Sequence, residues 1–223
     1  MVTIAELEIA DAPERWSALG FAVERERCRI GAVDLRFAGR DAGRGLIRWN
    51  LRDLPSSDGD PGSEPELDGL PTARAAAADA DAPAAQAASA GAHPNGVTAI
   101  DHVVAISPDL DRTVASLQAA GLELRRIREQ PTPAGAPRQA FFRLGAEILE
   151  VVQEPEEIAA RSGGRGRPAF FWGIALRCAD LDATVAGLGE RVSEIRPAVQ
   201  PGRRIASVRR VAGLALPVAL MTD

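Results

Sequence analysis

An internal repeat in the second half of the chain restricts its fold more than any other feature. Residues 109–111 (Asp-Leu-Asp) recur at 180–182, and residues 113–115 (Thr-Val-Ala) recur at 184–186 with the same offset. Each copy follows an apolar, β-branched run typical of a strand and opens a segment with helical spacing of its apolar residues. A repeat of this kind indicates two structurally equivalent units.

Both copies predict the element order strand, helix, strand, strand, strand. In the first copy, Ser107 and Pro108 are expected to start the helix as N-cap and first helical residue, and Gly121 to end it. Strands are predicted at 99–106, 123–129, 139–144 and 147–153 in the first copy, and at 170–178, 190–195, 204–211 and 214–221 in the second. The fold class is therefore α+β, with tandem βαβββ modules at 97–160 and 168–223.

The first part of the chain contains a fainter copy and a segment of different composition. Residues 1–54 show the same element order and are interpreted as a degenerate N-terminal module. Residues 55–96 are rich in Ala, Asp, Gly, Pro and Ser and contain almost no large apolar residue outside 67–72. Such a segment buries too little surface to offset its chain entropy, so we expect a flexible linker in which only 67–72 docks locally.

Composition excludes several classes of partner. The formal net charge of −5 and the pI near 5.2 argue against a nucleic-acid or anionic-membrane surface. The longest apolar run, 211–221, is shorter than the roughly 20 residues that cross a bilayer, and residues 1–11 lack the basic region of a signal peptide. Cys28 and Cys178 form no metal or disulfide motif. We therefore expect a cytoplasmic protein with two free thiols.

Several motifs of the central module resemble a known family. Residues 99–104 (Ala-Ile-Asp-His-Val-Val), 108–111 (Pro-Asp-Leu-Asp) and 120–122 (Ala-Gly-Leu) resemble the opening of vicinal-oxygen-chelate modules, and 141–152 resembles their closing hairpin. This superfamily includes glyoxalase and bleomycin-resistance proteins. The resemblance is good over 97–153, and it implies that paired modules form a cleft, in which metal ligands come from the first and last strands of each module.

Carried over by residue, the resemblance implies that His102 and Glu150 are metal ligands. An imidazole and a carboxylate suit Zn, Ni, Mn or Fe. The second module has Gly173 and Val218 at the aligned positions, and neither side chain can bind a metal. A stable site needs three or more protein ligands. Two alternatives remain: a polar pair without metal, or a homodimer in which two central modules combine their ligands.

Other residues are candidates for contacts with a small-molecule ligand. Arg138 and Arg143 flank the predicted cleft strand and would suit an anionic ligand. The arginine clusters at 125–128 and 203–210 could also clamp an anion, but a solvated strand face paired with nearby acids is the favoured interpretation for them. Phe142 and Trp172 are the aromatic candidates, although core packing explains most of the aromatics. His93 lies in a turn sequence and is expected to be solvated.

Two functional classes follow from these features. The first is a small-molecule binder without a complete metal site, similar to bleomycin-resistance proteins. The second is a metal-dependent lyase, isomerase or dioxygenase of the glyoxalase type that uses His102 and Glu150. The missing ligands at Gly173 and Val218 favour the first class. The fold alone cannot decide between them, because function resides in the site.

Overall fold

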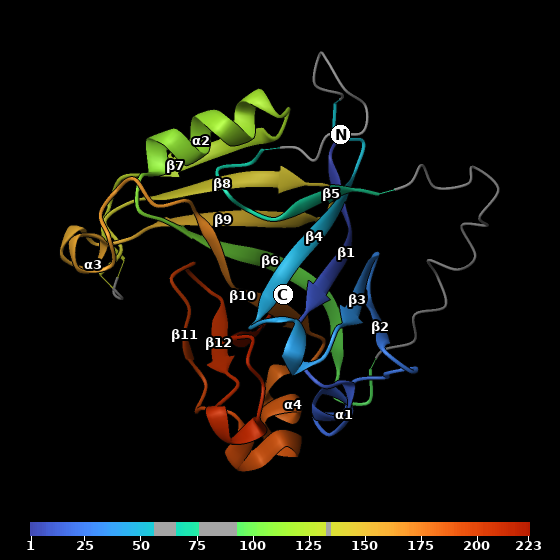
Figure 1. Cartoon of the computed structure of the whole chain (residues 1–223). Helices are drawn as coiled ribbons and strands as arrows, with labels where there is room; N and C mark the ends of the chain where they lie inside the picture. Colours follow the sequence, from blue (N-terminus) through green and yellow to red (C-terminus); the bar gives the residue numbers. More distant parts are fainter. Residues whose placement is uncertain (56–65, 76–92, 133–134) are drawn as a thin grey trace.

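The chain folds into two β-sheets with a few short helices, which confirms the predicted α+β class (Figure 1). This computed structural model describes residues 1–55, 66–75, 93–132 and 135–223. The strands are β1 (Thr3–Ile9), β2 (Arg27–Ile30), β3 (Val33–Phe37), β4 (Leu46–Arg52), β5 (Thr72–Arg74), β6 (Val97–Ser107), β7 (Glu123–Arg128), β8 (Gln139–Leu144), β9 (Glu147–Gln153), β10 (Phe170–Cys178), β11 (Arg196–Pro197), β12 (Arg204–Ser207) and β13 (Val218–Met221). The α-helices are α1 (Pro13–Ser17), α2 (Leu110–Ala119), α3 (Glu156–Arg161) and α4 (Leu181–Leu188), and in the described part of the chain none is long and apolar enough to cross a membrane.

The larger sheet has eight strands in the order β11-β12-β13-β10-β6-β9-β8-β7. It consists of two βαβββ units side by side, each with its first strand parallel to its last, β6 to β9 and β10 to β13. The two first strands, β6 and β10, pair antiparallel at the centre. The predicted tandem modules are thereby confirmed, and they share one continuous sheet.

The repeated aspartates begin the two equivalent helices. Asp109 accepts a hydrogen bond from the backbone N–H of Arg112, and Asp180 accepts one from that of Ala183. Each is the N-cap of its helix, which explains why this residue recurs in both modules. The sequence-based assignment of Ser107 as the N-cap is wrong, because Ser107 is the last residue of β6 and its buried hydroxyl instead accepts from the Asp109 N–H.

The C-terminal module differs in detail from the prediction. Residues 190–195 do not form a strand, since a 3₁₀ helix covers Gly189–Arg191 and only the short β11 follows. Arg191 stabilises this turn by donating to the carbonyl oxygens of Leu188 and Ala18. The contact with Ala18 joins two parts of the chain far apart in sequence, and a local pattern cannot reveal it.

The smaller sheet has five strands in the order β2-β3-β1-β4-β5. Residues 1–54 have the element order of a module, but their strands are paired differently. β1 lies between β3 and β4, as β6 lies between β9 and β10. β5 lies parallel to β4, as β13 lies parallel to β10. The N-terminal sheet therefore has the strand order of five consecutive strands of the larger sheet, β8-β9-β6-β10-β13.

β5 lies within the segment interpreted as a linker. Its residues follow Leu67 and Leu70, which are 0% and 2% exposed, so the predicted docking of this part extends to strand pairing. Much of the remaining segment, 56–65 and 76–92, lies outside the described residues. The division of the chain into a linker and domains stays a prediction.

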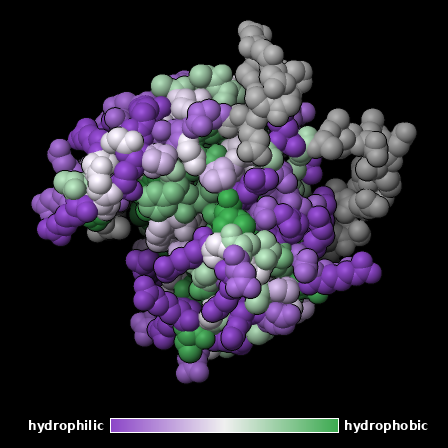
Figure 2. Space-filling model, in the orientation of Figure 1, coloured by the Kyte–Doolittle hydropathy of each residue, from purple (hydrophilic) through white to green (hydrophobic). Residues whose placement is uncertain are grey.

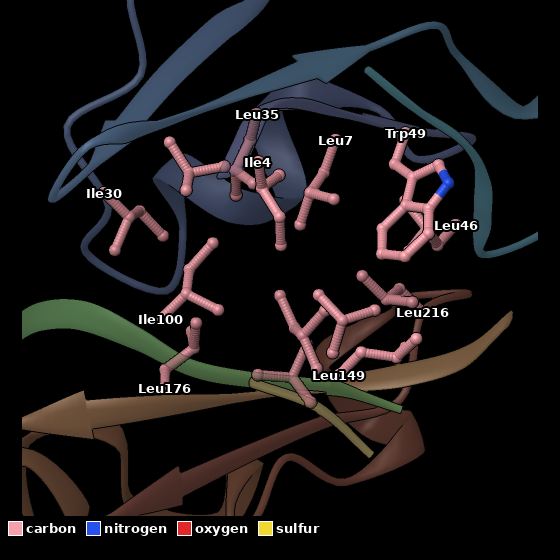
Figure 3. Packing of buried hydrophobic residues seen from close by; sticks show 14 of the residues in the cluster. Ile4, Leu7, Ile30, Leu35, Leu46, Trp49, Ile100, Leu149, Leu176 and Leu216 are labelled. Atoms are coloured by element: carbon pink, nitrogen blue, oxygen red, sulfur yellow. The ribbon is translucent and has the colours of Figure 1, made fainter. Parts of the chain in front are cut away.

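The two sheets pack face to face around a single hydrophobic core (Figure 3). Figure 3 shows Leu7 and Trp49 of the N-terminal sheet directed toward Leu149 and Leu216, and Ile30 toward Ile100. In Figure 1, α2 and α4 lie beyond opposite ends of the N-terminal sheet. Hydrophilic residues cover most of the outward face seen in Figure 2, with small apolar areas between them. Because side chains alternate along a strand, residues such as Glu150, between the buried Leu149 and Val151, point to the opposite face of the larger sheet.

His93 lies inside the protein, so the expectation of a solvated turn histidine is wrong. Its side chain is 6% exposed; Nδ1 accepts a hydrogen bond from the backbone N–H of Ala22, and Nε2 lies 4.0 Å from the sulfur of Cys28. Burial lowers the pKa of His93, and burial together with the charge of Asp34 raises the pKa of the Cys28 thiol to about 12. Cys28 is thus an unreactive thiol in the core.

Candidate functional site

A β-bulge in β6 creates the polar cluster on the open face of the larger sheet. Ala175 of β10 lies opposite His102, whereas the next residue, Leu176, lies opposite Ile100, so Asp101 is the extra residue. Consequently Asp101 and His102 both project from the open face, while Ile100 and Val103 are 0% exposed in the core. Without the bulge, Asp101 would point into the apolar core.

Five side chains form a continuous row of polar contacts on this face. Asp101 Oδ2 lies 2.8 Å from His102 Nδ1, and His102 Nε2 lies 3.4 Å from Glu150 Oε2. At one end Arg203 donates to both carboxylate oxygens of Asp101, at 2.9 and 3.1 Å. At the other end the amide of Gln139 donates to Glu150 Oε1. The row thus connects the C-terminal module to the central one.

Asp101 fixes the orientation of the His102 ring. Burial acts to raise the pKa of Asp101, but hydrogen bonds from His102 and Arg203 outweigh it and hold this pKa well below the usual range. An ionised carboxylate can only accept hydrogen bonds, so Nδ1 of His102 carries a hydrogen and donates it. Nε2 is thereby directed toward Glu150.

A pocket of about 340 Å³ opens above this row. It is lined by Asp101, His102, Arg125, Arg126, Phe141, Arg143, Ile148, Glu150 and Gln200. Gln200 precedes β12 of the C-terminal module, and the other lining residues belong to the central module. The volume falls within the range of about 300–1,000 Å³ that is usual for small-molecule sites. The pocket therefore has polar groups at its base and apolar side chains beside them.

The structure brings together some of the predicted contact residues and separates others. Arg143 lines the pocket, next to the predicted pair His102 and Glu150. Trp172 is 50% exposed on β10 and is not among the lining residues. The prediction for Phe142 is wrong, because Phe142 is 0% exposed and faces Leu149 in the core. Side chains alternate along β8, so the neighbouring Phe141 points to the open face.

Arg138 is also not in the pocket. Its guanidinium forms ion pairs with Asp111 and Glu129, at 3.0 and 2.8 Å, and these two carboxylates raise its pKa. Its charge is therefore already neutralised by neighbours outside the site. Sequence reasoning missed Asp101 and Gln139, although Asp101 adjoins His102 in the motif, and it named Arg203 only as part of an arginine cluster. The roles of these residues depend on the bulge and on contacts between modules.

The residues present do not fit a complete metal site. β6 and β9 pair Val104 with Glu150, and the equivalent pair in β10 and β13 is Ala175 with Ala219. Ala219, rather than the predicted Val218, is thus the counterpart of Glu150; Val218 points into the core. In the described ranges no group of three or more His, Cys, Asp or Glu side chains is arranged to hold a metal ion. One chain supplies two candidate ligands where three or more are needed.

The N-terminal sheet fills the equivalent positions with an ion-pair network. β1 has its own register shift between Ile4 and Glu6, which gives Glu6 the position that His102 has in β6. Glu6 accepts hydrogen bonds from Arg27 and Asn50, and its carboxylate also lies 3.4 Å from the guanidinium of Arg36. The acidic side chain is already paired, so this sheet offers no comparable group for a ligand.

Solved structures with similar folds include several methylmalonyl-CoA epimerases, whereas no family model and no curated protein matches the sequence. The epimerase from Mycobacterium tuberculosis has 22% identity, with 57% of this chain and 89% of that chain covered and a TM-score of 0.47. A Streptomyces coelicolor epimerase variant in complex with 2-nitronate-propionyl-CoA has 26% identity, covers 57% and 98%, and has a TM-score of 0.45. A hypothetical protein from Bacillus halodurans has 17% identity, covers 56% and 93%, and also has a TM-score of 0.45. Methylmalonyl-CoA epimerases belong to the vicinal-oxygen-chelate superfamily, which the sequence motifs resemble.

Proposed function

We propose that the chain binds a small organic molecule in the pocket above His102 and Glu150. The observation that carries this proposal is the convergence of two polar side chains from neighbouring rigid strands at the base of a pocket of about 340 Å³. Phe141 and Ile148 offer apolar contact beside them. A pocket with apolar walls and a few convergent polar groups is the usual form of a small-molecule site.

The arrangement is organised before a ligand arrives. His102 and Glu150 have side chains that are 16% and 15% exposed, and Asp101 and Gln139 hold them from either side. Such fixed groups lower the entropy cost of binding. The alternative function, a metal-dependent lyase, isomerase or dioxygenase, requires more ligands than His102 and Glu150.

A ligand screen by thermal shift on the wild type and on Phe141→Ala tests the proposal. Because Phe141 lines the pocket, we expect compounds that stabilise the wild type to bind Phe141→Ala about tenfold more weakly, a loss of about 1.4 kcal/mol. Phe170→Ala is the matched control, since Phe170 is 40% exposed and is not among the lining residues.

Equal affinities for the wild type and Phe141→Ala would contradict the proposal. That result would move binding elsewhere, for example to the hollow of about 420 Å³ between the end of α1 and α4, which is lined by Gly20, Asn95 and Thr184 among others.

A further inference from the structure

The charges around the pocket do not balance. Asp101 is paired with Arg203, whereas Glu150 accepts a hydrogen bond from the uncharged amide of Gln139 and lies 3.4 Å from His102 Nε2. The remaining lining charges are three guanidinium groups, of Arg125, Arg126 and Arg143. Among the described residues, Arg125 is the only one of the three with a carboxylate partner, since it lies 3.2 Å from Glu123. Arg126 and Arg143 thus form no ion pair in the described part of the chain, and together they outnumber Glu150, the lining carboxylate that has no arginine partner there.

Arg126 is also well oriented for an anion. Its guanidinium carbon lies over the Phe141 ring, 4.7 Å from the ring centre, which is a cation–π contact. A guanidinium in such a contact still has its N–H groups as hydrogen-bond donors. Arg143 lies on β8, two residues along from Phe141, and points to the same face. Guanidinium groups bind carboxylate and phosphate oxygens in pairs.

The C-terminal module cannot supply the second half of a metal site, both because of its residue types and because its backbone leaves no room for a side chain at the position of His102. At Gly173, the counterpart of His102, a Cβ atom would lie 2.6 Å from the carbonyl oxygen of Pro217. No side chain fits there without a backbone shift. In the central module, Nδ1 of His102 is already bonded to Asp101. The open hydrogen-bonding positions of the row are therefore at His102 Nε2 and Glu150.

We infer that the ligand is a small organic acid, bound without a metal ion, whose anionic group contacts Arg126 and Arg143. Its apolar part packs on Phe141 and Ile148, and a neighbouring polar group forms hydrogen bonds with His102 and Glu150. This inference rests on the proposed binding function and names the ligand class for the same pocket.

Calorimetric titration with matched acid and amide pairs tests the inference. The probes are benzoate with benzamide, succinate with succinamide and malate with malamide, each measured with EDTA and again with added Zn²⁺ or Mn²⁺. We expect acids to bind at least tenfold more tightly than their amides, with no change on adding EDTA. Arg143→Gln should weaken acid binding about tenfold. Arg161→Gln, the same charge change at an exposed position on α3, should bind as the wild type does.

Each other outcome is informative. Equal binding of acids and amides, weakened about tenfold by Phe141→Ala, overturns the anion class while the proposed binding function stands. Acid binding that requires Zn²⁺ or Mn²⁺ overturns the metal-free part. Acid binding that is unaffected by both Arg143→Gln and Phe141→Ala, or no binding by any acid, also overturns the inference.

Discussion

Trp49→Ala is expected to lower the free energy of unfolding by about 3–5 kcal/mol. The side chain is 0% exposed at the junction of the two sheets, where its ring lies edge-on to Phe171 at 5.1 Å between ring centres. Its Nε1 also donates to Thr72 Oγ1 at 2.7 Å, so the truncation removes packing and leaves a buried hydroxyl without this partner. Urea denaturation followed by circular dichroism measures the loss.

Trp172→Ala is the matched control, because Trp172 is 50% exposed. Its effect should stay within about 0.5 kcal/mol, as for most surface substitutions. If Trp49→Ala costs as little as Trp172→Ala, the N-terminal sheet does not share a core with the larger sheet. The N-terminal sheet would then not cover the opposite face of the larger sheet, and the assignment of the pocket to the uncovered face would be wrong.

Gly173→Ala is expected to destabilise the fold by about 1–3 kcal/mol, the usual cost of overpacking. The new methyl group would lie 2.6 Å from the Pro217 carbonyl oxygen and 3.1 Å from the Pro217 Cβ. That carbonyl accepts a hydrogen bond from the Ile174 N–H, next to the parallel pairing of Ile174 with Val218, so relief of the clash disturbs the sheet. Chemical denaturation of the purified variant gives the value.

Gly187→Ala provides the control for the same substitution in open space. Gly187 lies in α4 and a Cβ there meets nothing within 4 Å, so alanine should leave stability unchanged or raise it by about 0.5–1 kcal/mol. A Gly173→Ala variant as stable as the wild type would show that this position accepts a side chain. It would then remove the steric reason for the absent second half of a metal site.

Several elements of the two modules could be predicted because local signals agree with tertiary structure there. β8, β9 and β10 have the predicted bounds, since alternation and turn glycines specify both the strands and their ends. The strand at 190–195 was predicted from the repeated element order, but the contact of Arg191 with the distant carbonyl of Ala18 favours a turn. α3 was missed, although Pro155 followed by two acids is a helix-start signal.

The site could be predicted only in part. The juxtaposition of His102 and Glu150 follows from strand alternation and from the family resemblance, and the two side chains do meet. The bulge that turns Asp101 to the same face has no local sequence signal, so the row from Arg203 to Gln139 could not be derived. For Phe142, the choice between two adjacent phenylalanines depended on register, which the sequence does not specify.

Nitrogen NMR of the two histidine rings tests the central claim most directly. The chain has two histidines, so His93→Gln assigns both signals. Without ligand, Nδ1 of His102 should carry a hydrogen, because it donates to Asp101, whereas Nδ1 of His93 should carry none, because it accepts from Ala22. A saturating organic acid such as malate should then shift the His102 ring signals and leave those of His93 in place. A shift of His93 alone, or a His102 ring without a hydrogen at Nδ1, would contradict the account.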